Sequence, residues 1–162
     1  MTEDDIITFV SGLPGTAVFT AGPGDGSPEV AWGDSFFFYD PDGLDSIPAD
    51  GRLPYATIVT KDYPGFDTAS GLDRPGVFRL NVAVGRVVFE RLVGYPPAAH
   101  AEHHAGTDYA VLDRVIPHPL YATQSWISIL NPEDAEPAQA ILRDAHARAT
   151  ERHRRPPGKS PA

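Results

Sequence analysis

Hydrophobic residues follow two different spacings along the chain, one at its ends and another in its middle. At the start, apolar positions within 6–10 recur at helical spacing, which predicts a helix over 3–12 with Thr2 as its N-cap. Near the end, Pro132 and two acidic residues are typical of a helix start, and the following residues carry an apolar face that includes Leu142. The sequence therefore predicts a helix at each end of the chain.

The middle of the chain contains runs of β-branched and aromatic residues, separated by turns rich in glycine and proline. This pattern is typical of strands. The runs predict strands at 16–21, 29–39 with a bend at Gly33, 55–60, 77–84, 110–116 and 125–130.

Three connecting segments have patterns of their own. Residues 62–76 are rich in glycine and proline and predict an ordered surface loop. Residues 96–105 predict a short helix. Residues 86–93 allow two interpretations, because two adjacent valines favour a strand whereas the later apolar residues suit a short helix that ends at Gly94. We favour the helix.

Strands gathered between terminal helices are typical of an α+β fold. We expect an antiparallel sheet meander with the N- and C-terminal helices packed on one face, forming a single domain over 1–155 with a flexible tail at 156–162. Trp126 is expected to anchor the core between the sheet and the last helix if its side chain faces inward. Ile127 and Ile129 compete for the inward positions, because neighbouring residues of a strand face opposite sides.

Composition narrows the classes of protein. The 162 residues include no cysteine, which excludes disulfides, thiol catalysis, iron–sulfur clusters and cysteine-based zinc sites. No apolar run approaches the roughly 20 residues that span a bilayer. The acidic start, Met1 to Asp5, differs from the basic start of a signal peptide. The sequence therefore predicts a cytoplasmic globular protein with no membrane partner.

The formal net charge of −9 is unevenly distributed. Residues 143–162 carry a net charge of +4, so that residues 1–142 carry −13. An acidic body repels a phosphate backbone, and we therefore expect no nucleic-acid partner and no duplex binding at physiological salt. The basic end is typical of a solvated helix terminus, where cations favour the helix dipole.

The predicted strand 77–84 supplies the most informative polar pair. Side chains alternate along a strand, so Arg79 and Asn81 share the face opposite Phe78 and Leu80. If Phe78 and Leu80 pack on the helices, the pair projects from the open face of the sheet. There a guanidinium beside an amide can clamp a carboxylate or a phosphate. An ordinary solvated sheet face is the alternative.

Two further pairs can join Arg79 and Asn81. Lys61 and Tyr63 directly follow the third predicted strand. Trp32 and Asp34 are two residues apart and share a face of their predicted strand if the glycine between them introduces no bulge. We expect these aromatic, cationic and acidic side chains to line the same ligand site.

His118 lies between two prolines, with Tyr121 three residues later. The prolines stiffen the backbone and can hold the imidazole in a fixed orientation, as general acid or base catalysis requires. A histidine that caps a turn explains the same pattern. His118 and Asp34 are thus the candidate catalytic groups, and Tyr121 is a candidate ligand-binding residue.

Metal and phosphate sites have weaker signals. A short helix would place His100 on the same face as His103 and His104, but a surface histidine cluster is favoured and we expect no metal ion and no cofactor. The glycine-rich loop 22–26 lacks the lysine and hydroxyl ending of a P-loop and predicts a hairpin connection. The acidic stretch 40–45 misses the later positions of a calcium-binding loop and predicts a turn.

Several runs carry a resemblance to a known family. They lie at 22–37 (GPGDGSPEVAWGDSFF), 58–64, 72–81, 117–121 and 126–132. Together they resemble an uncharacterised actinobacterial family, a domain of unknown function. More distantly, the order of helix, sheet meander, tryptophan strand and final helix resembles the MmcQ/YjbR-like fold. The resemblance implies a family and a fold, and members of that fold group have been suggested to bind DNA.

Three functions remain open from the sequence. The leading hypothesis is a protein that binds a small polar or anionic ligand, or a partner segment, on the open face of the sheet. The second is a small enzyme without metal or cofactor, in which His118 or Asp34 moves a proton and Arg79 neutralises developing negative charge. The third is a nucleic-acid-binding regulator that acts through the arginine-rich C-terminal helix. The enzyme requires a concave pocket that contains a carboxyl or imidazole of shifted pKa.

Overall fold

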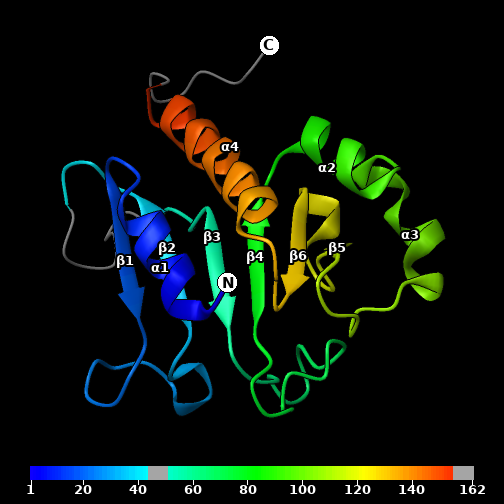
Figure 1. Cartoon of the computed structure of the whole chain (residues 1–162), viewed down its shortest axis with the longest axis horizontal. Helices are drawn as coiled ribbons and strands as arrows, with labels where there is room; N and C mark the ends of the chain where they lie inside the picture. Colours follow the sequence, from blue (N-terminus) through cyan, green and yellow to red (C-terminus); the bar gives the residue numbers. More distant parts are fainter. Residues whose placement is uncertain (44–50, 155–162) are drawn as a thin grey trace.

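The computed structural model describes residues 1–43 and 51–154. In this part of the chain six strands form one antiparallel sheet in the order β1-β2-β3-β4-β6-β5. The first four strands form the predicted meander, whereas β6 pairs with β4 and places β5 at the edge (Figure 1). The strands are β1 (Thr16–Thr20), β2 (Ser35–Tyr39), β3 (Ala56–Val59), β4 (Arg79–Ala83), β5 (Val115–Pro117) and β6 (Trp126–Leu130).

Three helices bury their apolar sides against one face of this sheet: α1 (Glu3–Ser11), α2 (Arg86–Val93) and α4 (Ala135–Arg154). Figure 1 shows α1 and α4 in front of the strands. Ile6, Phe89 and Leu142, one from each helix, are fully buried in the same cluster as Leu80 and Ile127 of the sheet. The predicted α+β fold, with both terminal helices on one face, is therefore confirmed.

Local signals explain where these helices start and stop. The Thr2 side chain accepts a hydrogen bond from the Asp5 backbone, and the Asp5 carboxylate accepts one from the Thr2 backbone, a capping box at the start of α1. The segment 86–93 is a helix, as favoured, and it ends at Gly94, whose φ of +98° suits glycine. The predicted helix 96–105 is a series of short helical turns that includes α3 (His100–His103).

The predicted strand 29–39 is wrong in its first half. Glu29–Ala31 form a turn of 3₁₀-helix, Gly33 has a φ of +91°, and β2 begins only at Ser35. The alternation of a strand therefore does not relate Trp32 to Asp34. The predicted strand 110–116 is likewise shorter, because β5 covers only Val115–Pro117 and Leu112 forms a single isolated bridge to Leu130.

The expected role of Trp126 as an anchor of the core is also wrong, because Ile127 and Ile129 take the inward positions for which the two sets of side chains competed. Ile127 and Ile129 occupy the core on the helix side, and Trp126 is half-buried on the opposite face. The predicted tail 156–162 and part of the acidic stretch 40–45 lie outside the described residues.

Candidate functional site

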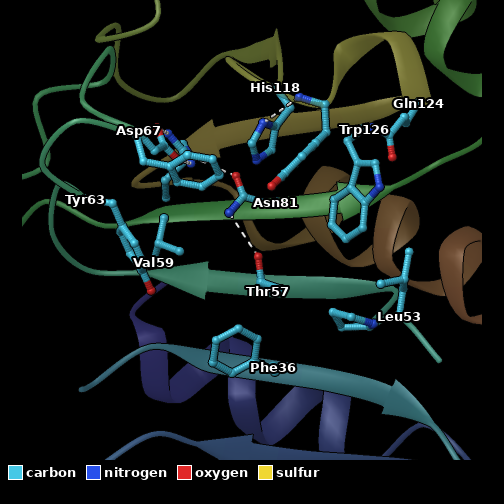
Figure 2. A pocket seen from close by; sticks show the side chains of 14 residues that line it. Phe36, Leu53, Thr57, Val59, Tyr63, Asp67, Asn81, His118, Gln124 and Trp126 are labelled. Atoms are coloured by element: carbon cyan, nitrogen blue, oxygen red, sulfur yellow. Dashed lines mark hydrogen bonds and ion pairs between the residues drawn. The ribbon is translucent and has the colours of Figure 1, made fainter. Parts of the chain in front are cut away.

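The face of the sheet away from α1 and α4 carries a row of side chains that crosses four strands. The registers align Phe36 of β2 with Thr57 of β3, Thr57 with Asn81 of β4, and Asn81 with Ser128 of β6. Side chains directly opposite on antiparallel strands lie about 5 Å apart, so neighbours in the row can interact. Phe36, Thr57 and Asn81 of this row form the floor of the candidate site (Figure 2).

Part of this face is covered by the loop 62–76. Its Leu72 packs with Tyr109, Ile116 and Leu130 in a second apolar cluster. A cavity of about 340 Å³ remains beside the loop. Its lining includes five of the residues that the sequence nominates and several that it does not: Phe36, Leu53, Pro54, Thr57, Val59, Tyr63, Phe66, Asp67, Arg79, Asn81, His118, Tyr121, Gln124 and Trp126.

Arg79 is the buried cation of the site. Its guanidinium forms a two-pronged ion pair with Asp67, at 3.1 Å for Nη1 to Oδ1 and 2.5 Å for Nη2 to Oδ2, and Nη1 also donates to Ser70 Oγ at 3.0 Å. Its exposed fraction is 0%. The expectation of an exposed arginine on an open face is therefore wrong, because the loop 62–76 folds back over it. A charge that is already paired and buried does not create a positive patch for a ligand.

Asn81 links Arg79 to the rest of the floor. Its Oδ1 accepts from Arg79 Nε at 2.8 Å and from Ser128 Oγ at 2.7 Å, while its Nδ2 donates to Thr57 Oγ1 at 3.0 Å. The predicted common face of Arg79 and Asn81, opposite Phe78 and Leu80, is confirmed by these contacts and by the burial of Phe78 and Leu80 in the core. The polar floor is thus internally satisfied and rigid.

His118 caps a turn and also faces the cavity. Its Nδ1 accepts hydrogen bonds from the backbone N–H groups of Leu120 at 3.0 Å and Tyr121 at 3.1 Å. An Nδ1 that accepts twice carries no proton, so the neutral ring carries its proton on Nε2. Every fully buried polar side-chain atom of the described residues has a partner. Nε2, which has none among them, is therefore open to the cavity, as Figure 2 shows.

The charge state of His118 follows from the same surroundings. Burial and, to a smaller extent, the positive charge of Arg79 lower the pKa of His118 to about 3. The ring is consequently neutral near pH 7, and its Nε2–H is a fixed hydrogen-bond donor. Tyr121 lies against it at 4.8 Å between ring centroids, and Trp126 meets it edge-on at 6.2 Å.

Tyr63 lines the opposite end of the cavity from Trp126 (Figure 2). Its hydroxyl donates to Asp34 Oδ2. Asp34 is fully buried, and its Oδ1 also accepts from the Thr60 backbone at 2.8 Å and the Thr60 hydroxyl at 2.9 Å. Burial raises the pKa of Asp34, and burial together with Asp34 raises that of Tyr63. Asp34 therefore positions Tyr63 and does not itself reach the cavity.

Two other predicted residues also lie outside the cavity lining. Lys61 Nζ donates to the backbone carbonyl of Trp32, and Trp32 Nε1 donates to the carbonyl of Ser27 at 3.2 Å. Through these hydrogen bonds the segment that connects β1 and β2 packs against the end of β3. The structure thus brings together Tyr63, Arg79, Asn81, His118 and Tyr121, and gives Trp32, Asp34 and Lys61 supporting contacts beside them.

The histidine cluster pairs with tyrosines. His100 contacts the Tyr95 hydroxyl through Nδ1 at 2.8 Å and the Tyr109 hydroxyl through Nε2 at 3.2 Å, while His104 Nδ1 contacts the same Tyr109 hydroxyl at 2.6 Å. His103 stacks on Tyr95 with 3.9 Å between ring centroids. Over residues 1–43 and 51–154, no three histidine or acidic side chains are grouped so that they could hold a metal ion.

Sequence reasoning missed Asp67, Gln124, Thr57 and the apolar wall of the cavity. Thr57 had a usable signal, because it lies on a predicted strand that neighbours 77–84 along the chain. Asp67 had only its place in a polar loop, and Gln124 only its place before a strand. The sequence position of neither residue predicts which side chains it contacts in the folded protein.

Comparison with known proteins places the chain in a family. The model of a "Family of unknown function (DUF6194)" matches residues 1–158. The chain belongs to this family. No curated protein and no solved structure matches it. The predicted membership of a family of unknown function is confirmed at this level, and the actinobacterial and MmcQ/YjbR-like parts of that resemblance stay predictions. Among the described helices, none combines the length and apolar character needed to cross a membrane.

Proposed function

We propose that this protein binds a small molecule in the cavity on the open face of the sheet. One observation carries the proposal: His118 directs an Nε2–H donor without an acceptor among the described residues into a cavity with a largely apolar wall. Ligand sites commonly combine such walls with a few fixed polar groups. The cavity volume of about 340 Å³ lies within the range of small-molecule sites.

The chemistry of the lining favours a flat, apolar body with a hydrogen-bond acceptor. Trp126 and Tyr121 offer aromatic surface, and a carbonyl, hydroxyl or ring nitrogen would accept from His118 Nε2. The positive charge of Arg79 is already paired with Asp67, so Arg79 is a poor binding partner for an anionic ligand. The proposal thus keeps the small polar ligand of the sequence hypothesis and moves its polar contact from Arg79 to His118.

The geometry does not favour proton transfer as the function. A general base needs a free lone pair, and the Nδ1 lone pair of His118 already accepts two backbone hydrogen bonds. The Asp34 carboxylate is 0% exposed and accepts three hydrogen bonds. The expected absence of a nucleic-acid partner, the MmcQ/YjbR-like resemblance and a cytoplasmic location stay predictions from the sequence. No contact of the described residues adds support to them.

Calorimetric titration with 6-acetyl-2-naphthol tests the proposal, because this neutral probe combines a flat aromatic body with a carbonyl acceptor. The wild-type protein should bind it. His118→Asn keeps an oxygen near the place of Nδ1 but removes the Nε2–H, and should weaken binding about fivefold, the value of one hydrogen bond. His103→Asn, the same exchange outside the cavity, should change nothing. Absent binding by the wild type, or equal affinity of His118→Asn, would refute the proposal.

A further inference from the structure

A second cavity adjoins the first at the end of the sheet, beside the last turns of α4. Its volume is about 600 Å³. Leu53, Pro54 and Trp126 line both cavities. Figure 2 shows Leu53 and Trp126 at one end of the first cavity, away from Tyr63. A ligand that passes these side chains would therefore occupy both spaces.

The second cavity differs from the first in charge. Arg52, Arg148, Arg152 and His153 line it, and none of its described lining residues is acidic. Arg52 also contacts Asp40, with 3.3 Å from Nη1 to Oδ1. Asp40 thus offsets the charge of Arg52, and the cationic contribution to this cavity comes from Arg152 of α4.

Helical spacing brings the α4 side chains to this place. Positions 145 and 149 are four residues apart, as are positions 148 and 152, so that all four lie on one side of α4. Two of them are alanines, which leave space beside the two arginines.

The absence of a side chain at Gly85 leaves room for the guanidinium of Arg148. A Cβ at residue 85 would lie only 2.5 Å from Arg148 Nε, so the guanidinium occupies space that only a glycine leaves open. Gly85 also has a φ of +82°, which disfavours other residues. In the structure, Arg148 therefore packs its guanidinium against the backbone of Gly85.

Arg152 is the arginine most available to a ligand. It is exposed, and it forms no ion pair within the described part of the chain. Its guanidinium offers a planar fork of donors that matches a phosphate or carboxylate.

We propose that the second cavity holds the anionic group, a phosphate or a carboxylate, of a ligand whose flat apolar body lies in the first cavity. This inference rests on the proposed function, because it places the body of the ligand against Trp126 and His118. It also restores the anionic ligand expected from the sequence, held by arginines of α4 in place of Arg79.

Matched neutral and anionic probes test the contribution of each cavity to ligand binding separately. The neutral 6-acetyl-2-naphthol reports on the first cavity, whereas 6-acetyl-2-naphthyl phosphate and 6-acetyl-2-naphthoate add the two kinds of anion. Calorimetric titration of the full chain should show that at least one anion binds about fivefold to tenfold tighter than the neutral probe, as expected for a charge-assisted contact. Raising the salt concentration to about 0.5 M should reduce this advantage, because salt screens the attraction.

Arginine variants then locate the anion. Arg152→Gln should remove most of the advantage of the anionic probe and leave the affinity for the neutral probe unchanged. Arg154→Gln is the matched control, since it removes the same charge from the same helix end at a residue that does not line the cavity. Its anion affinity should stay close to that of the wild type.

The possible failures are distinct. If the neutral probe binds but neither anion binds more tightly, or if Arg152→Gln and Arg154→Gln behave alike, the inference is wrong and the proposed function stands. If the neutral probe does not bind, the proposed function is wrong, and the inference fails with it. Binding of inorganic phosphate without binding of the neutral probe would refute a ligand that extends across both cavities.

Discussion

His118 makes the stability of the fold depend on pH in a way that one substitution can remove. In the folded protein its pKa is lowered to about 3, mainly by burial, from an ordinary value of 6.5. Between these two pH values the unfolded chain takes up a proton on this histidine that the folded chain does not. The free energy of unfolding therefore falls as the pH falls through this window, and the stabilisation is complete above the ordinary pKa.

The magnitude follows from the size of the shift. Each unit of pH below the ordinary pKa costs about 1.4 kcal/mol until the folded pKa is reached. At about pH 5 this one group lowers the free energy of unfolding by about 2 kcal/mol, and at about pH 3, where the folded histidine is itself half protonated, by about 4 kcal/mol. Values of this size are a large part of the stability of a small domain.

Urea unfolding at several pH values measures the effect. His118→Asn cannot take up the proton, and its side-chain oxygen can still accept from the turn that Nδ1 caps. Its loss of stability between about pH 7 and about pH 5 should be smaller than the loss in the wild type by about 2 kcal/mol. His103→Asn, at an exposed ring, should behave as the wild type. Equal losses in the wild type and His118→Asn would refute the reasoning.

Three other predictions concern the buried ion pair, the wall of the cavity and the charge of the chain. Arg79→Met leaves Asp67 buried without its partner and should lower the free energy of unfolding by about 3–5 kcal/mol in urea titration; a loss below about 1 kcal/mol would show that the pair is dispensable. Trp126→Ala removes a half-buried side chain from the cavity wall and should cost about 2 kcal/mol, less than for a core tryptophan, while abolishing binding of 6-acetyl-2-naphthol. A gel-shift titration with duplex DNA at physiological salt should show no complex; a complex that weakens steeply with added salt would contradict the charge argument.

The fold was largely predictable because its signals are local. The capping box at Thr2, the glycine that ends α2 and the alternating strand 77–84 each depend on residues within a few positions of one another. One failure was also local in origin. The segment 29–39 has the composition of one strand, but Gly33 adopts a positive φ and β2 starts after it.

The site separates what the sequence by itself determined from what only the tertiary structure decided. Strand alternation predicted that Arg79 and Asn81 share one face. The two prolines beside His118 predicted an imidazole of fixed orientation. Both predictions were possible because they depend only on neighbouring residues. Contacts between distant segments decided the rest of the site. They determine which residue pairs with Arg79, which way Trp126 faces, and that two cavities meet at Trp126. Whether a charged side chain is a ligand contact or half of a buried ion pair depends on what covers it, and here the loop carrying Asp67 covers it.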